Sequence, residues 1–136
     1  MNSDKTKELL IEMEGWLPQP QRDSDGKLNL GFGFNLTDYP LPWEVAIYWL
    51  EYIILDCVED LVSIFPKFAE FSDNWQTALI DMRYNLGPRK FRKFTDMIAA
   101  INRGDGEAAA RECLDSIRGR KLKRRSKIDA ELLRGG

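Results

Sequence analysis

The stretch EMEGWLPQPQRDSDGKLNLGFGFN, residues 12–35, decides the fold, because the spacing of apolar residues changes within it. Before it, apolar residues recur every three or four positions, which predicts a helix over residues 4–14. Gly15 and Pro18 are typical of a helix end, so Glu14 is expected in the last turn. The stretch therefore opens with a carboxylate at the end of a helix.

The second half of this stretch predicts β-structure. From Lys27 to Leu36 apolar residues occupy every second position, which predicts a strand with one apolar face. Its other face carries Asn29, Gly31, Gly33 and Asn35, so we expect it to be nearly bare. The turn residues Asp23-Ser24-Asp25-Gly26 precede it, and we expect a small hairpin or three-stranded sheet near residues 19–36.

The remainder of the chain predicts helices, and the fold class is α+β, mostly α. The predicted helices cover residues 43–65, a segment from Ser72 to Gly87, and residues 91–103, 106–117 and 121–133. The first would be roughly 34 Å long, enough to connect two lobes. At 136 residues we expect one domain, residues 1–136, with a small β lobe over about 15–40 and a helical lobe over 1–14 and 43–136.

The composition excludes several kinds of site. The sequence has no histidine, which excludes Ser-His-Asp and Cys-His nucleophiles as well as zinc sites built on histidine. Cys57 and Cys113 lie in helical patterns without CxxC spacing, and we expect free thiols in the core. We expect no metal and no cofactor, which leaves carboxylates as the acid and base groups.

Residues 43–65 are apolar enough to raise the question of a membrane span. Four acidic residues interrupt the segment at depths where a charge is costly, so we expect a buried helix and no stable membrane insertion: Glu51, Asp56, Glu59 and Asp60. Its aromatic residues could form a platform on which sugars stack, but we expect them to line the core, with Trp43 or Tyr48 at most reaching the cleft: Trp43, Tyr48, Trp49 and Tyr52. The polar N-terminus MNSDKTKELL lacks the apolar stretch of a signal peptide, which favours synthesis in the cytoplasm without one.

Two carboxylates on different elements are the minimum equipment for cleaving a glycosidic bond. Glu14 is the candidate acid, because the negative end of the helix dipole disfavours its ionised form. Glu12 flanks the other edge of the same face, and the Gly15 turn favours Glu14 over it. Asp23 and Asp25 are both candidates for the base, since a carboxylate beside a turn stays ionised.

The bare strand face completes this candidate site. Gly31 and Gly33 would leave room for a ligand against the backbone, and the Asn29 amide could hold a water or a sugar. Asn35 continues the polar line. The glycines do not fit a dinucleotide fingerprint, which needs a following helix, and the aspartates do not fit a calcium loop.

These residues resemble the signature of phage-type lysozymes, glycoside hydrolase family 24. The likeness rests on Glu14-Gly15, on Asp23 eight residues after Gly15, and on the run NLGFGFNL at 29–36. It continues in NWQTALIDMRYNLG at 74–87 and INRGDGEAAARECLDS at 101–116, and the basic segment towards Ala130 matches the position of the family's last helix. Nearly the whole chain is covered.

The resemblance implies a lysozyme-like two-lobed fold and a muramidase that cleaves the β-1,4 bond between N-acetylmuramic acid and N-acetylglucosamine in peptidoglycan. It implies Glu14 as general acid and Asp23 as the carboxylate that activates water or steadies positive charge. Arg125, or Arg124 beside it, is implied as the arginine that pairs with the acid. Family members invert the anomeric carbon, which calls for carboxyl groups about 6.5–9.5 Å apart.

Asn29 departs from the family, which has threonine at this position. An amide can still position water, but its bulk would weaken or alter turnover. A catalytically weak relative that only binds peptidoglycan, as a tail, effector or assembly module, is therefore the alternative function.

The basic segment RGRKLKRRSK, residues 118–127, raises the question of an anionic partner. A helical domain that binds nucleic acid is the rival from another class, and the lack of aromatic residues in this segment disfavours it. We expect peptidoglycan glycan strands as the partner, no nucleic acid, and a monomer. A muramidase without a signal would reach the cell wall after release, as a phage endolysin, an injected effector or a virion-borne enzyme.

Overall fold

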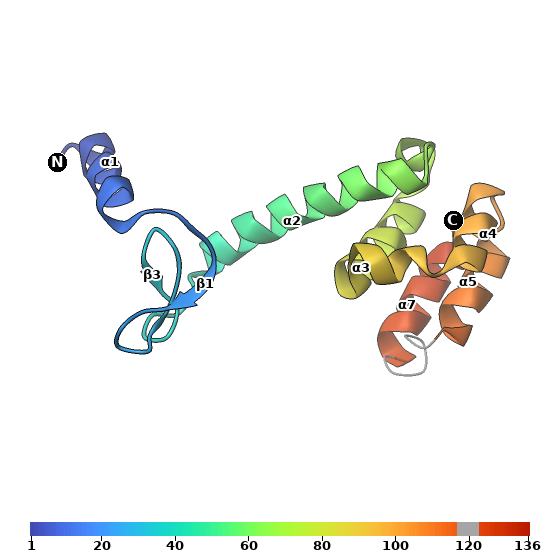
Figure 1. Ribbon diagram of the computed structural model, residues 1–136. Helices are drawn as coiled ribbons and strands as arrows, with labels where there is room; N and C mark the ends of the chain where they lie inside the picture. The colour runs from blue at the N-terminus through green and yellow to red at the C-terminus, as the bar shows by residue number, and fades with distance from the viewer. Residues whose placement is uncertain (117–122) are drawn as a thin grey trace. The chain divides into compact units, whose positions relative to one another are not determined.

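The computed structural model describes residues 1–116 and 123–136 (Figure 1). The fold is α+β and mostly helical, as predicted, with one small sheet. The chain divides into two compact units: residues 1–48, here the N-terminal unit, and residues 49–136, the C-terminal unit. Helix α2 (Trp43–Ile64) runs through the boundary. This division puts residues 1–14 in the same unit as the sheet, whereas the sequence pattern had grouped them with the helical lobe.

Helix α1 (Ser3–Glu14) begins and ends where the sequence predicts. The Asn2 side chain accepts a hydrogen bond of 3.0 Å from the Lys5 N–H, which caps the first turn. At the other end Gly15 has φ 72°, and its N–H donates to the Ile11 carbonyl at 3.0 Å. Glu14 is therefore the last helical residue, with the chain turning sharply after it.

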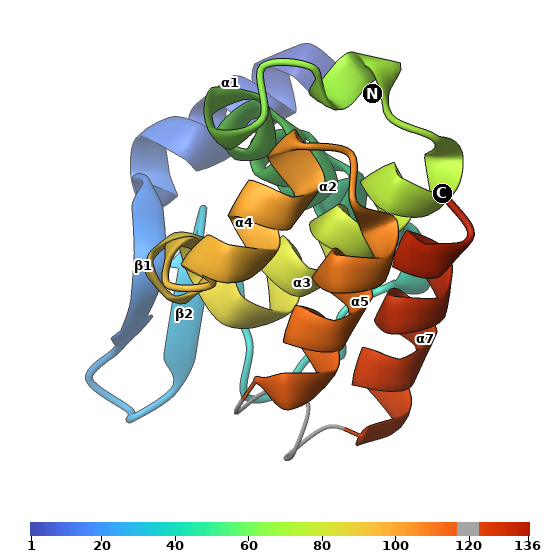
Figure 2. The same ribbon diagram turned by 90° about the vertical axis from the view of Figure 1, so that its right-hand side faces the viewer.

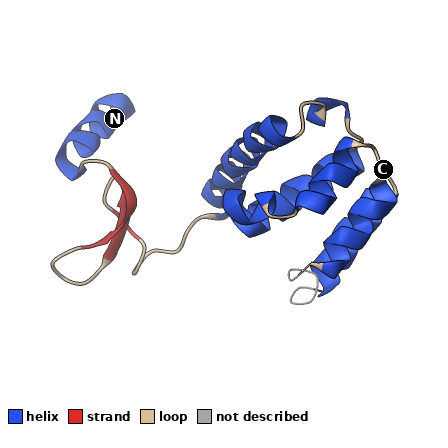
Figure 3. Cartoon of the chain, turned by 45° about the vertical axis from the view of Figure 1, so that its right-hand side comes forward, coloured by secondary structure: helices blue, strands red, loops and turns tan. Residues whose placement is uncertain are grey.

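Three strands follow and form an antiparallel sheet in the order β1-β2-β3, which confirms the predicted sheet (Figure 3). Their bounds are Leu17–Arg22 for β1, Leu28–Gly31 for β2 and Phe34–Asn35 for β3. The predicted unbroken strand from Lys27 to Leu36 is wrong. Gly31 (φ 69°) and Gly33 (φ 71°) adopt left-handed backbone conformations, and the chain reverses so that Leu30 pairs with Phe34.

Helix α2 spans the predicted range, but it is not the buried helix that the sequence suggested. Among its residues Cys57 and Leu61 are buried. The core assignment of its aromatic residues is wrong, because four of them are exposed: Trp43, Tyr48, Trp49 and Tyr52. No helix in residues 1–116 or 123–136 combines the length and apolar character needed to cross a membrane.

The C-terminal unit continues with a short 3-10 turn, η1 (Phe68–Glu70), and helix α3 (Asp73–Arg92). Ser72 caps α3 as predicted, its side chain accepting from the Trp75 N–H at 3.2 Å. The predicted helix end at Gly87-Pro88 is a kink: Gly87 has φ 79° and ψ 169°, and helical geometry resumes to Arg92.

Three more helices complete the described chain. Their bounds are Thr95–Asn102 for α4, Gly106–Asp115 for α5 and Lys123–Arg134 for α7. Helix α4 starts four residues later than predicted, because α3 continues past the kink to Arg92, and Lys93 and Phe94 connect the two helices. Residues 121 and 122 of the last predicted helix, and residue 117 of the one before it, lie outside the described residues.

The hydrophobic core belongs to the C-terminal unit. Helix α5 packs against α4 and α7, and α7 also packs against α3 (Figure 2). The largest fully buried apolar side chains come from several segments of this unit: Phe65, Phe91, Leu61, Leu79, Met82, Met97, Ile101 and Leu133. Cys57 and Cys113 are buried free thiols, as predicted, and burial raises the pKa of Cys57.

Candidate functional site

The structure brings the predicted acid to the glycine turn of the sheet. The Glu14 carboxylate lies against Gly33, where a Cβ atom would come within 2.5 Å of Glu14 Oε2. Gly33 is therefore glycine for two reasons, its left-handed backbone and the close approach of this side chain. Both residues belong to the N-terminal unit, and Glu14 is exposed there.

Asp23, the predicted second carboxylate, is ordered by its own turn. Its Oδ1 accepts the N–H groups of Asp25 and Lys27, both at 2.9 Å. Its Oδ2 accepts the side-chain amide of Asn29 at 3.0 Å. The bond from Asn29, followed by the bond from the Lys27 backbone, lowers the pKa of Asp23 below its ordinary value of 3.8. Asp23 is therefore held in its ionised form.

Asp25, the other candidate base, differs from Asp23 in its hydrogen bonding. It supplies its backbone N–H to Asp23, and its own carboxylate accepts no hydrogen bond from the residues that the structure describes. The turn therefore organises one of the two aspartates and leaves the other in solvent.

Asn29 is paired with the carboxylate rather than pointing to open space. Its Nδ2 donates to Asp23 Oδ2 and, at 3.2 Å, to the Lys27 carbonyl. Both amide hydrogens are used in these bonds, so Oδ1 is the group that Asn29 offers to a water or ligand. The sequence pattern predicted that Asn29 would hold the water and did not predict its bond to Asp23.

The remaining predicted residues of the sheet have structural partners. A Cβ at Gly31 would come within 2.6 Å of the Phe34 ring, so this glycine admits an aromatic side chain. Asn35 Oδ1 accepts the N–H groups of Thr37 and Asp38, and its Nδ2 donates to Asp38 Oδ2 at 2.8 Å. The predicted roles of Gly31, Gly33 and Asn35 in substrate binding stay predictions.

Arg125 lies in the C-terminal unit and forms a two-pronged ion pair with Asp81. Its Nε and Nη2 donate to the two carboxylate oxygens at 2.8 and 2.6 Å. This pair raises the pKa of Arg125. Arg124 beside it is exposed. The pairing of either arginine with the acid stays a prediction, and residues 117–122 of the basic segment lie outside the described residues.

Sequence reasoning missed two features of the N-terminal unit. Asp38 accepts from Lys27 Nζ at 2.9 Å and from Asn35, and these bonds lower the pKa of Asp38. The centre of the Trp16 ring lies 5.2 Å from that of Phe32. The spacing of Asn35 and Asp38 is typical of a capped turn, and this signal could have predicted the hydrogen bond between them.

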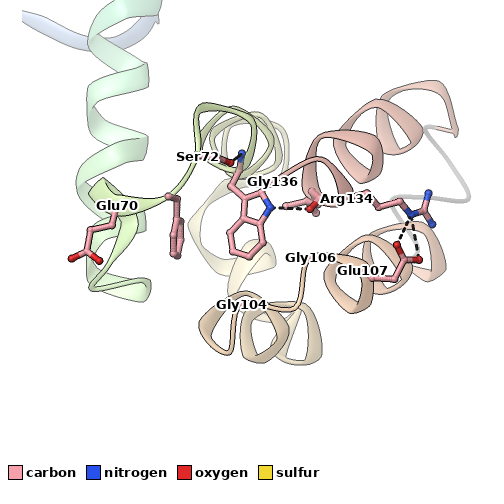
Figure 4. Close-up of a pocket in the computed structure, with 10 residues that line it drawn as sticks. Glu70, Ser72, Gly104, Gly106, Glu107, Arg134 and Gly136 are labelled. Atoms are coloured by element: carbon pink, nitrogen blue, oxygen red, sulfur yellow. Dashed lines mark hydrogen bonds and ion pairs between the residues drawn. The ribbon is translucent and has the colours of Figure 1, made fainter.

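The C-terminal unit contains an open pocket of about 370 Å³ between η1, α5 and the end of α7. None of the predicted site residues lines it. Its polar groups are largely paired: the Trp75 indole donates to the Leu133 carbonyl at 2.8 Å, and Arg134 pairs with Glu107 at 3.2 Å (Figure 4). The predicted carboxylate chemistry therefore belongs to the N-terminal unit.

No model of a known protein family matches the chain, and its sequence matches no curated protein. The lysozyme resemblance therefore rests on the residues quoted from the sequence. The geometry around Glu14 and Asp23 is the physical basis on which a function can be proposed.

Proposed function

We propose that this protein is a muramidase that cleaves the β-1,4 bond between N-acetylmuramic acid and N-acetylglucosamine in peptidoglycan. The observation that carries the proposal is that one sheet organises both carboxylates. The turn at Gly33 receives the Glu14 carboxylate, and strand β2 of the same sheet carries Asn29, which holds Asp23. Two carboxyl groups on separate elements are the groups that glycoside hydrolysis requires.

Glu14 is the proposed general acid. A general acid protonates the departing glycosidic oxygen, and for this it must reach the substrate. Glu14 is exposed at the end of α1, where Gly15 ends the helix and lets the side chain turn to the sheet. Its contact with Gly33 fixes one side of the carboxylate.

Asp23 is the proposed ionised partner. Its lowered pKa makes it a weak proton acceptor, because proton transfer is most efficient when the pKa of the base is near the working pH. The same hydrogen bonds make it a stable negative charge. Of the two roles implied by the resemblance, steadying positive charge therefore suits Asp23 better than activating water by removing its proton.

The alternative function is a catalytically weak protein that binds peptidoglycan. Its support is the use of both Asn29 amide hydrogens on Asp23 and Lys27, which leaves a single acceptor atom for the water. On this alternative the chain serves as a tail, effector or assembly module.

Digestion of purified peptidoglycan, with mass analysis of the released muropeptides, tests the proposal. We expect products with muramic acid at the reducing end from the wild type, and a loss of roughly a thousandfold or more for Glu14→Gln. Asp23→Asn should also lose most activity. Binding without product from the wild type would reject the muramidase and favour the alternative.

The chain offers a matched control for each carboxylate. Glu12→Gln removes the neighbouring acid of α1, and Asp25→Asn removes the solvated aspartate of the same turn. Both should keep activity within about threefold of the wild type, because neither carboxylate is held by the sheet. A larger loss in Glu12→Gln than in Glu14→Gln would move the acid to Glu12.

A further inference from the structure

A dense cluster of positive charge follows the kink in α3. Four of the five residues 89–93 are basic, and residues 84–95 contain no acidic residue. Arg89, Lys90, Arg92 and Lys93 are all exposed. The chain as a whole has a net charge of −2, so this segment differs in sign from its surroundings.

The fold fixes this segment from two sides. Phe91 is fully buried, with its ring centre 6.3 Å from that of Phe65. Arg92 binds Asp60 of α2 through both of its terminal nitrogens and donates to the Pro88 carbonyl at 3.0 Å. The turn is therefore anchored, and its basic side chains are presented from a defined backbone.

Three of the four charges have no acidic partner in the part of the chain that the structure describes. Arg92 is paired with Asp60, whereas Arg89, Lys90 and Lys93 form no ion pair with any acidic residue that the structure describes. Lys93, the C-cap of α3, follows Lys90 by three residues and Arg89 by four, the spacing at which side chains are neighbours on a helical turn. Like charges at this spacing repel, and an anion bound between them would relieve that repulsion.

We propose that Arg89, Lys90 and Lys93, here the basic patch, bind the carboxylates of the peptides carried by the glycan. The proposal rests on the function proposed above and assigns a second contact with the same polymer. Long basic side chains suit repeated carboxylates along a flexible polymer, because point charges need little geometric match.

Other anionic partners fit the basic patch less well. Phe91 is buried and Phe94 is half-buried, so residues 89–94 present no exposed ring on which a nucleobase could stack. Residues 89–94 also expose no large apolar side chain that could enter a membrane surface. The basic patch therefore offers a ligand charged groups without apolar surface, which favours a hydrated polyanion as its partner.

Sedimentation with purified peptidoglycan sacculi tests the proposal in the full-length Glu14→Gln background, which keeps the polymer intact. The test variant replaces Arg89, Lys90 and Lys93 with glutamine. The matched control replaces Lys5, Lys67 and Arg111 with glutamine, three exposed basic residues from separate parts of the chain, and so changes the net charge equally. Circular dichroism checks that each variant is folded.

At low salt we expect the test variant to bind sacculi roughly tenfold more weakly than its parent, and the control variant to lose less than about threefold. The difference should disappear at about 1 M salt, where screening is strong. It should also disappear on sacculi whose carboxylates have been converted to neutral amides.

Each other outcome overturns the inference. Equal losses in the test and control variants would assign binding to net charge. Unchanged sacculus binding, with weaker binding of duplex DNA by the test variant, would assign the basic patch to nucleic acid. Muropeptide release by the wild type is measured separately. Cleavage without an effect of the basic patch rejects this inference alone, whereas patch-dependent binding without cleavage rejects the muramidase alone.

Discussion

The two units of this protein are held together by different interactions. Among residues 1–48, all of which the structure describes, Gly31 alone is buried. Hydrogen bonds to Asp23 and Asn35 and glycine turns maintain the sheet. The C-terminal unit instead has a continuous apolar core that includes Phe65, Phe91 and Leu133.

We therefore expect the N-terminal unit to determine the geometry of the proposed site and the C-terminal unit to determine the free energy of unfolding. Hydrogen bonds position Asp23, and the close approach to Gly33 positions Glu14, so substitutions there should change chemistry more than they change the free energy of unfolding. Substitutions in the C-terminal core should do the reverse, because burial of apolar surface contributes more to stability than hydrogen bonds at an exposed turn do.

Separate expression of the two units gives the largest contrast. We expect a peptide of residues 1–48 to be largely unfolded, since a short helix and a small sheet without a core are marginal in water. Residues 49–136 should be helical and melt cooperatively, because they contain the core. Circular dichroism measures both. A cooperative melt of residues 1–48 would show that the sheet is stable by itself.

Removing one aromatic ring from each unit of the full chain gives the next contrast. Phe91→Ala should lower the free energy of unfolding by about 3–5 kcal/mol, because the ring is fully buried. Trp16→Ala should cost about 1 kcal/mol, since Trp16 is 64% exposed and contacts mainly Phe32. Urea unfolding measures both. Similar losses would mean that the N-terminal unit depends on apolar packing after all.

Asp60 gives a test by pH. Its bonds with Arg92, and then Arg83, lower its pKa from 3.8 to about 2 in the folded chain. The unfolded carboxylate therefore takes up a proton first as pH falls. Asp60 should contribute about 2 kcal/mol above about pH 5, and this contribution should be lost progressively as pH falls through 3.8 towards 2.

Asp60→Asn should remove this contribution. The variant should be less stable than the wild type at pH 7, and its stability should fall less between about pH 5 and pH 2. Urea unfolding at a series of pH values measures the difference. Parallel curves for the two proteins would exclude Asp60 as the group responsible.

The sequence predicted the helices well, because their signals are local. Ser72 before the stripe of α3 and Gly15 after Glu14 are capping signals that depend on a few neighbouring residues. The prediction of one strand over residues 27–36 was wrong because it depended on more than local signals. Apolar residues alternate throughout this range, but Gly31 and Gly33 both adopt left-handed conformations. The sequence alone does not show at which glycines the chain reverses.

The candidate site was predictable in its residue types and not in its contacts. Paired acids beside a glycine-rich stretch indicated Glu14 with either Asp23 or Asp25, and the family resemblance singled out Asp23. The bond from Asn29 to Asp23, six residues apart in the chain, depends on how the turn folds back on β2. The exposure of Trp43 and Tyr48 was likewise not predicted, because apolar residues in a helix indicate burial but do not identify the element that would cover them.

A substitution at Gly33 tests whether the position of the Glu14 carboxylate affects turnover independently of stability. Gly33→Ala should lose roughly tenfold to a hundredfold in turnover, because the new methyl group would displace the Glu14 carboxylate. Gly26→Ala is the matched control: its φ is 76°, but a Cβ there has no atom within 4 Å. Both should cost about 1 kcal/mol of stability through backbone strain. Equal activity of the two variants would remove the functional meaning of the Glu14 contact.

Asn29 gives the smallest and most specific effect. Because its side chain is the largest cause of the lowered pKa of Asp23, Asn29→Ala should raise that pKa towards its ordinary value. As pH falls, Asp23 would then be protonated earlier, so the acidic limb of the pH–activity profile should move to higher pH while the basic limb stays.

Asn35→Ala is the control for this shift. Asn35 is the cross-strand partner of Asn29, and the substitution removes the same kind of side-chain amide. The hydrogen bonds of Asn35, however, are made with the turn at Asp38. It should leave the acidic limb in place, even where the overall rate falls. An equal movement of that limb in both variants would mean that the whole sheet, rather than the bond from Asn29, sets the charge of Asp23. A shift confined to Asn29→Ala would identify Asp23 as the ionised group whose loss stops turnover.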